Sequence, residues 1–393
     1  MLNTKQVALL TVTLVNCFVA LSVSALDIDK VKVQSNILDN TFFQELDAGL
    51  RLNLDSNRFD GIYREDQQDG YTYDSQLRRA RLSLKLPIAK NWSSKLQVAL
   101  NEGDDSYEIK DLYIRYKGFD VADIKIGQSK EPFGLENLTS SANTLLTERA
   151  LAVFALGRSK GINLSNYTSQ YTWSVGAYNV EQNGKVKADG DKAYTARATF
   201  SPVNTIASYN HIGVAYSKRD LQGAEYELKT NGGVDSAVNL VDTKNIAADT
   251  VEKSGVEIAW GRGPLSLQGE YQRLQINASE ALENATYEGY YSQLSYFLTD
   301  DHRAYKKGRF TSVKPSSSAG AWELILRKGT LQSVHIGSAN KNTDIEIVST
   351  VLGVNYYLSK RIKFMLNAID TDASGIDNGN SGSALSLRAQ IKL

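Results

Sequence analysis

The chain has 393 residues, with 44 Lys and Arg against 44 Asp and Glu, 21 Tyr, 5 Pro and a single Cys. This balanced charge excludes the basic excess that nucleic-acid binding requires, and one cysteine cannot form a disulfide framework or a cysteine-based metal site. The length suits two globular domains or one large barrel, and the tyrosine-rich, proline-poor composition favours the barrel.

Residues 1–25 differ from the rest of the chain. Lys5 precedes an apolar run over 7–23 that ends in small residues of the kind a signal peptidase cuts. The competing interpretation is a transmembrane anchor, but the run is short and no stop-transfer cluster follows it. We therefore expect a cleaved signal peptide that contains Cys17 and a mature chain over 26–393.

Short segments of alternating apolar and polar residues follow. In the stretch 79–86, RARLSLKL, every second residue is apolar. This period of two predicts strands with one apolar and one polar face. Sixteen such segments are found: 44–55, 74–86, 92–101, 107–116, 121–128, 160–167, 171–178, 192–200, 209–217, 253–260, 264–274, 286–298, 320–328, 344–358, 361–370 and 383–393.

The connections between these segments are long and short in turn, which is typical of an outer-membrane barrel with short periplasmic turns and long external loops. Two connections break the alternation. The connection 102–106 is short for an external loop, and 299–319 is long where a short turn is due. Aromatic residues near the segment ends predict girdles at the two membrane interfaces: Trp92, Tyr116, Phe200, Tyr216, Trp260, Tyr271, Trp322 and Tyr356.

Three stretches of the chain carry a family resemblance. The first begins LRRARLSLKLPIAKNWSSKLQVAL and runs on to IKIGQSKEPFGLENLTSSANTLLTERAL. The second is RAYKKGRFTSVKPSSSAGAWELILRKGTL, and the third is LGVNYYLSKRIKFMLNAI. In this order they resemble the phosphate-selective porin O and P family, most specifically in GQSKEPFGLENLTSS and GAWEL. One departure is the final Leu393, where barrels of this type usually end in an aromatic residue.

The resemblance implies an all-β fold, a transmembrane antiparallel β-barrel of about sixteen strands, assembled as a homotrimer in the outer membrane of a Gram-negative bacterium. It implies a porin without enzymatic activity or cofactor, whose partners are small anions such as phosphate together with outer-membrane lipid and lipopolysaccharide. Lysines and arginines lining the pore bind phosphate or pyrophosphate in the best-known members.

The third long connection, 129–159, is the candidate constriction. It is long enough to fold into the lumen, and its many apolar residues predict that it packs against another surface. The alternative is a plain surface loop.

If the polar face of each strand is luminal, fourteen basic side chains point inward: Arg51, Arg79, Arg81, Lys85, Lys95, Arg115, Lys125, Arg197, Lys253, Arg327, Arg361, Lys363, Arg388 and Lys392. Eight acidic ones accompany them: Glu45, Asp47, Asp55, Asp111, Asp123, Glu257, Glu270 and Glu323. This inward excess of positive charge predicts an anion path. Its candidate residues are Arg79, Arg81, Lys85, Arg115, Lys125, Lys130, Arg149, Arg158 and Lys160.

Other functional classes find little support. The three histidines are scattered without metal-ligand spacing, and no GxSxG motif indicates a hydrolase. Each inward arginine could alternatively brace the wall by pairing with a carboxylate. The rival to a porin is a secreted or surface β-protein that binds carbohydrate or acts as an adhesin without forming a pore.

Overall fold

The structure is a computed structural model. It describes residues 46–65, 70–101, 106–179, 181–182, 185–186, 192–243, 246–279, 284–335, 345–376 and 379–393. The predicted signal peptide and Glu45 lie outside the described residues.

The described residues form a closed antiparallel barrel of sixteen strands, as predicted. Each strand pairs with its neighbours in chain order, and the ring closes where the first strand pairs with the last, Arg51 opposite Lys392. The strands are β1 (Asp47–Phe59), β2 (Thr72–Ala89), β3 (Trp92–Leu100), β4 (Tyr107–Tyr116), β5 (Asp123–Lys130), β6 (Arg158–Tyr167), β7 (Tyr171–Asn179), β10 (Lys192–Phe200), β11 (Ser208–Tyr226), β14 (Ile246–Arg262), β15 (Leu265–Ala278), β16 (Ala285–Phe297), β19 (Ala321–His335), β20 (Glu346–Tyr357), β21 (Ile362–Ser374) and β22 (Ser381–Lys392).

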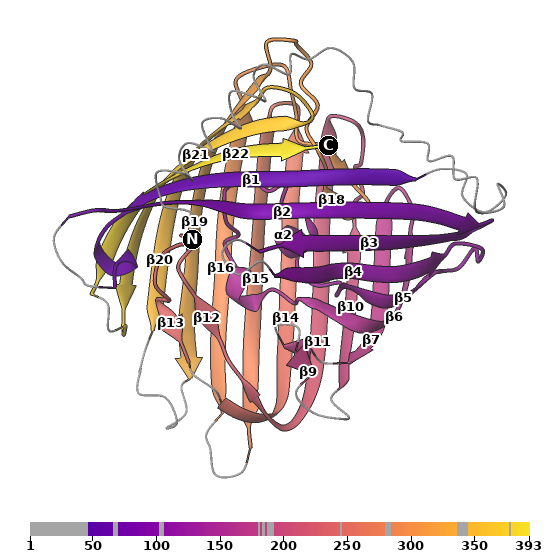
Figure 1. Ribbon diagram of the computed structural model, residues 1–393, viewed down its shortest axis with the longest axis horizontal. Helices are drawn as coiled ribbons and strands as arrows, with labels where there is room; N and C mark the ends of the chain where they lie inside the picture. The colour runs from indigo at the N-terminus through magenta and orange to yellow at the C-terminus, as the bar shows by residue number, and fades with distance from the viewer. Residues whose placement is uncertain are drawn as a thin grey trace.

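The two walls of the barrel cross at a steep angle in Figure 1, with β1–β7 in front and β10–β20 behind. Strands that tilt strongly against the barrel axis produce this crossing when a sheet closes on itself.

Side chains alternate between a buried inner face and an exposed outer face along each strand. On β21, Met365 and Ile369 are buried, whereas Phe364 and Leu366 on the opposite face are exposed. The exposed face is largely leucine, isoleucine and valine, so the barrel is apolar outside and polar inside. This arrangement is the reverse of a soluble sandwich, whose apolar faces are buried.

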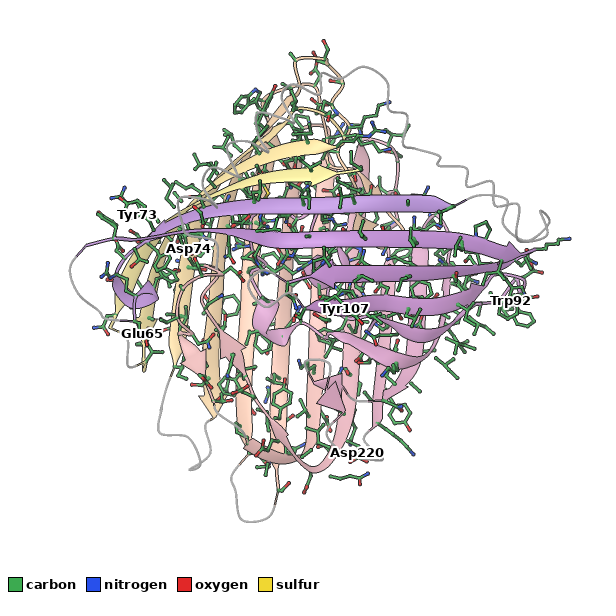
Figure 2. The ribbon with its side chains drawn as sticks, viewed as in Figure 1. Glu65, Tyr73, Asp74, Trp92, Tyr107 and Asp220 are labelled. Atoms are coloured by element: carbon green, nitrogen blue, oxygen red, sulfur yellow. The ribbon has the colours of Figure 1, made fainter. Side chains whose placement is uncertain are left out.

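The two ends of the barrel differ. One end, here called the turn end, carries the short connections 90–91, 168–170 and 263–264; the other, the loop end, carries 60–71, 131–157 and 227–245. Figure 2 shows Trp92 at the turn end, opposite Tyr73 at the loop end.

Outward aromatic residues mark both ends of the strands. At the turn end, the Trp92 and Tyr116 rings lie 4.7 Å apart and those of Trp322 and Tyr356 4.5 Å apart. Tyr216, Tyr271 and Tyr290 are exposed on strands further round the wall, toward the loop end.

Small elements lie in the connections: η1 (Gly61–Tyr63), α2 (Leu135–Leu138), η2 (Ala152–Phe154) and the two-stranded pairs β8 (Glu181–Gln182) with β9 (Lys185–Val186), β12 (Lys229–Thr230) with β13 (Val241–Asp242), and β17 (Tyr305–Lys306) with β18 (Arg309–Phe310). Among the described residues, no helix has the length and apolar character needed to cross a bilayer.

Candidate functional site

The connection between β5 and β6, residues 131–157 and here called the inner loop, is hydrogen-bonded to inward-facing side chains of the barrel. The backbone N–H groups of Leu135 and Glu136, at the start of α2, donate to the Glu270 carboxylate on β15 at 2.9 and 2.7 Å. Glu270 therefore satisfies two N–H groups that the short helix leaves without intrahelical partners.

Strands nearer the β1–β22 closure also hold the inner loop. Asn355 on β20 donates to the Leu145 carbonyl at 2.9 Å, and Arg388 on β22 donates to the Thr147 carbonyl at 2.5 Å. Lys363, Lys253 and Arg327 donate to further loop carbonyls, those of Thr144, Phe154 and Glu148.

Apolar side chains fix the loop to the same part of the wall. Leu145, Leu146 and Phe154 are buried in one cluster with wall residues such as Tyr287 and Ile325. Burying this surface stabilises the loop against the wall, so the loop's apolar content, which predicted packing, is explained by this contact.

The connection 298–320 at the turn end, here called the hairpin segment, also contacts inner-wall residues. Its two-stranded tip turns at Lys307 and Gly308, both with positive φ, 54° and 70°. A side chain at Gly308 would meet Thr172 and Thr199 within about 3 Å, so glycine is required there. The length that broke the predicted loop alternation is therefore used to form a hairpin.

The hairpin segment meets the inner loop directly. Ser312 donates to the Asn143 side chain at 3.0 Å, and the Phe310 N–H donates to the Thr139 hydroxyl at 3.4 Å. Two connections from opposite ends of the barrel are thus in contact.

Between these two segments and strands β1–β6 lies a cavity of about 510 Å³. Among the residues that the structure describes, twelve basic side chains line it, with Asp111 as the one carboxylate: Arg51, Arg79, Arg81, Lys85, Lys95, Arg115, Lys117, Lys125, Lys130, Arg149, Arg158 and Arg309.

Asp111 and carboxylates just outside the cavity neutralise only part of its positive charge. Asp111 pairs with both Lys95 and Arg158, the latter at 2.6 Å. Arg115 pairs with Asp123, Lys85 with Asp47 and, at 3.9 Å, Arg79 with Glu148.

Some of the remaining cations have neutral partners. Arg51 donates to the Ser140 and Ser141 hydroxyls at 3.0 and 2.9 Å, and Lys130 donates to the Asn137 carbonyl at 2.6 Å. Arg81 forms no ion pair with a carboxylate that the structure describes.

The Nε atoms of Arg51, Arg79 and Arg81 are buried and have no hydrogen-bond partner within the described part of the chain. All three residues line the cavity, and guanidinium groups are well suited to bind an oxyanion there.

Glu148 and Arg149, at the far end of the inner loop, show the electrostatics of the site. Burial alone would raise the pKa of Glu148, but the guanidinium groups of Arg78, Arg79 and Arg388 outweigh it and hold this pKa well below its usual range. Burial lowers the pKa of Arg149, and nearby Arg158 lowers it further. The arginines around Glu148, of which Arg79 lines the cavity, therefore favour a negative charge beside them.

The inward basic residues of β10–β22 serve mainly as braces. Arg197 donates to both oxygens of Glu257, at 2.8 and 2.5 Å, and Arg388 donates to both oxygens of Asp55 at 2.7 and 2.6 Å. These pairs are buried and satisfied. The bracing role left open by the sequence thus applies to this part of the wall, whereas the basic residues of β1–β6 line the cavity.

Eight of the nine candidate anion-path residues line the cavity, from Arg79 to Arg158, and Lys160 does not. Lys160 is exposed and lies on the outward face of β6 with Ile162 and Leu164, away from the cavity. The alternation resumes at Ser159, which is buried, and this puts Lys160 on the outside.

Sequence reasoning missed three residues. Arg309 comes from the hairpin segment and Lys117 from a turn, and both line the cavity. Arg78 pairs with Asp235 at 2.8 Å and with Glu148 at 3.2 Å. The signal for Arg309 was the unexpectedly long connection 299–319 with its basic KKGR turn.

A second, smaller pocket of about 20 Å³ lies beside the hairpin segment, against β20–β22. Its lining includes Arg303, Lys360, Arg361, Lys363 and Lys392. Lys392 is paired with Arg51 across β22 and β1, so the basic surface continues from the cavity into this pocket.

Among the described residues, no group of three His, Cys, Asp or Glu side chains is arranged to hold a metal ion.

Comparisons with known proteins agree with this architecture. The model of the family described as phosphate-selective porin O and P matches residues 46–393. Porin O of Pseudomonas aeruginosa is 28% identical over 370 residues, which cover 84% of each chain.

Solved structures share the fold. The anion-selective porin from Comamonas acidovorans superposes with a TM-score of 0.57 at 12% identity, covering 88% of this chain and 99% of that one. The outer membrane channel DcaP of Acinetobacter baumannii gives a TM-score of 0.57 at 12% identity, covering 89% and 97%. With the family match and the closed, outwardly apolar barrel, these findings exclude the non-pore alternative: the chain belongs to the phosphate-selective porin O and P family and is an integral outer-membrane porin.

Proposed function

We propose that the cavity of about 510 Å³ beside β1–β6 is the anion path of this porin and the place where selectivity arises. The observation that carries the proposal is its lining of twelve basic side chains and one carboxylate, in a chain of zero formal net charge. Like charges held this close are costly unless anions occupy the space between them. Several moderately strong sites in succession let an anion enter and also leave.

Phosphate is the anion that the site suits best. The guanidinium groups of Arg51, Arg79 and Arg81 line the cavity together. Guanidinium groups bind phosphate oxygens through paired hydrogen bonds, and phosphate offers enough acceptors for several of them together. The family description, which names phosphate, supports the same choice.

The inner loop narrows the pore in this account. It is held by polar and apolar contacts against β15, β16 and β19–β22, which leaves the path to run along β1–β6. Porins select by charge and radius at the narrowest point, so the loop brings permeant ions within reach of Arg79 and Arg81.

We propose that the functional unit is a homotrimer, with the short strands β3–β7 at the subunit contact. β5 has 8 residues and β11 has 19. A strand of eight residues rises about 27 Å and, at a tilt of about 40°, spans roughly 21 Å, less than the apolar band of about 25 Å. A neighbouring copy covers this shorter wall better than lipid does.

Outer-membrane lipid and lipopolysaccharide cover the rest of the outward face in this proposal. Beyond the outward tyrosines toward the loop end, Lys218 pairs with Glu252 at 3.4 Å and Arg273 pairs with Glu288 at 3.3 Å. Charged side chains at this level suit phosphate-bearing headgroups.

The function is tested by block of chloride current. Phosphate added to a planar bilayer that holds the wild-type porin should reduce single-channel chloride current in a saturable manner. Arg81→Ala should weaken the block, whereas Arg273→Ala, which removes the same charge from the outer face, should not. Absence of any block by phosphate in the wild type would contradict the proposed phosphate path.

A further inference from the structure

The hairpin segment 298–320 crosses the turn-end opening of the barrel. Its base joins β16 to β19, and its tip reaches the far wall, where Lys307 lies 3.5 Å from the centre of the Tyr167 ring at the end of β6. The neighbouring periplasmic turns consist of only a few residues, so the connection from β16 to β19 does not need a segment that crosses the opening.

We propose that His211 and Tyr305 form a latch that holds this hairpin across the opening and so positions Arg309 in the anion cavity. His211, on β11, hydrogen-bonds to the Tyr305 hydroxyl through Nδ1 at 2.6 Å and to Glu257 through Nε2 at 3.0 Å. The role of Arg309 in selectivity rests on the proposed function; the latch itself does not.

Further polar contacts complete the latch. The Tyr305 hydroxyl also hydrogen-bonds to Ser201 at 2.8 Å. Arg197, already paired with Glu257, donates to the carbonyl of Gly308 at the hairpin tip at 2.9 Å. One carboxylate therefore orients both the histidine that binds Tyr305 and the arginine that binds Gly308.

Aromatic packing seals this network from water. The Tyr305 ring stacks on Tyr209 at 5.1 Å, and Phe310 packs edge-on against both rings. His211 is 1% exposed. A buried polar group that loses its partner costs more than the hydrogen bond itself contributes. A hairpin that shifts leaves several such groups without partners until water reaches them.

The latch affects the pore because Tyr305 is only a few residues from Arg309 in the chain. Arg309 lines the cavity, whereas Tyr305 and Phe310 on either side of the turn are anchored in the wall. If Tyr305 is released, Arg309 loses its fixed place among the other cations. His211 and Tyr305 are thus positioning residues, and Arg309 is the residue that meets the anion.

A cysteine reporter tests whether the latch holds. Thr199 is a luminal residue of β10 that is 5% exposed and lies beneath Gly308. In a Cys17→Ser background, Thr199→Cys should react slowly with an anionic methanethiosulfonate reagent while the hairpin is closed.

Tyr305→Phe keeps the ring and removes the hydroxyl. It should raise the reaction rate of Cys at 199 about tenfold, the factor by which loss of one buried hydrogen bond shifts an opening equilibrium. Tyr209→Phe removes a hydroxyl from the stacked neighbour and should leave the rate unchanged. His211→Gln provides a second variant if Tyr305→Phe fails to fold, and heat-modifiability on a gel verifies folding of each.

Selectivity measured on the same variants completes the test. Tyr305→Phe and Arg309→Ala should both lower anion selectivity, but Arg309→Ala should leave the reaction rate at position 199 unchanged. An unchanged rate in folded Tyr305→Phe and His211→Gln would overturn the latch. A faster rate with unchanged selectivity would overturn the positioning of Arg309. If the wild type proved not to be anion-selective, the proposed function would fail while the rate would still decide the latch.

Discussion

A single bulge decides which arginines of β2 reach the cavity. Asn53 pairs with Arg79 but Asp55 pairs with Gln76, so two residues of β2 oppose one of β1. The bulge changes which residues of β2 face inward. Between the loop end and the bulge these are the even-numbered residues. Beyond the bulge they are the odd-numbered residues, including Arg79 and Arg81. The extra residue brings Arg78 inward as well.

The first prediction concerns Arg79 and Arg81. The double variant Arg79→Ala with Arg81→Ala should lower anion selectivity and weaken block of chloride current by phosphate, because two of the arginines that line the cavity are removed. Thermal stability in detergent should change little, since Glu148 keeps its ion pairs with Arg78 and Arg388 and Arg81 has no carboxylate partner among the described residues. A loss of stability with intact selectivity would assign these arginines a bracing role.

The second prediction concerns Glu148. Its pKa is held below the ordinary value of 4.5. The ion pairs of Glu148 therefore stabilise the folded barrel fully at pH values above 4.5, and this stabilisation is lost as the pH falls toward the lower folded-state pKa. Glu148→Gln should therefore lower the thermal midpoint in detergent at pH 7, by an amount that stays constant down to about pH 5 and shrinks in stronger acid.

Thermal melts of both proteins from pH 7 to pH 3 check this. The removal of one partner from a buried charge pair typically costs about 3–5 kcal/mol. Glu346→Gln, an exposed carboxylate at the start of β20, is the matched control and should have no comparable effect. If the difference in thermal midpoint between the wild type and Glu148→Gln grew as the pH fell, the ion pairs of Glu148 would not be the source of this stability.

At the scale of elements, strands could be predicted from the sequence but inserted connections could not. All sixteen predicted segments correspond to strands because each strand that faces lipid on one side must alternate. β11 extends to Tyr226, beyond the predicted end at 217, because the pattern inverts there: Lys218 faces out to water and Leu221 is buried inside.

The hairpin segment shows why the rest of the site was missed. Tyr305 and His211 are 94 residues apart, and no local pattern reports a contact across the lumen. The cations of β1–β5 were predictable because strand parity points them inward. Which inward cations are braces and which line a cavity depends on the wall that the inner loop covers, and only the tertiary contacts decide that.

The third prediction tests the inner loop. Replacement of residues 135–146 by a short Gly–Ser linker should raise single-channel conductance several-fold if this segment, which is hydrogen-bonded to side chains of β15 and β20–β22, narrows the pore. Single-channel recording measures the effect, and heat-modifiability verifies that the barrel has folded. Unchanged conductance in a folded barrel would mean that the loop does not narrow the pore.

At the scale of the whole molecule, an apolar outer band and a basic inner path coexist in a chain with no net charge. Leu294, Leu326 and Leu352 are exposed neighbours on three consecutive strands of the outer face. The hydrophobic effect therefore places the barrel in lipid.

The fourth prediction follows from this band. Leu326→Arg should destabilise the folded barrel by about 2–4 kcal/mol in a bilayer, whereas Val334→Arg, close to the loop end of the same strand, should cost about 0–1 kcal/mol. Equilibrium unfolding from lipid vesicles with denaturant measures both. Equal costs at the two positions would contradict the placement of the apolar band.

The reversal potential of the wild-type porin in a potassium chloride gradient across a planar bilayer tests the central claim most directly. The twelve basic side chains and one carboxylate of the cavity predict a potential whose sign corresponds to chloride carrying most of the current. Arg51→Ala, Arg81→Ala and Arg309→Ala should each move it toward zero. A potential of the opposite sign, with potassium carrying most of the current, would contradict the assignment of this cavity as an anion path.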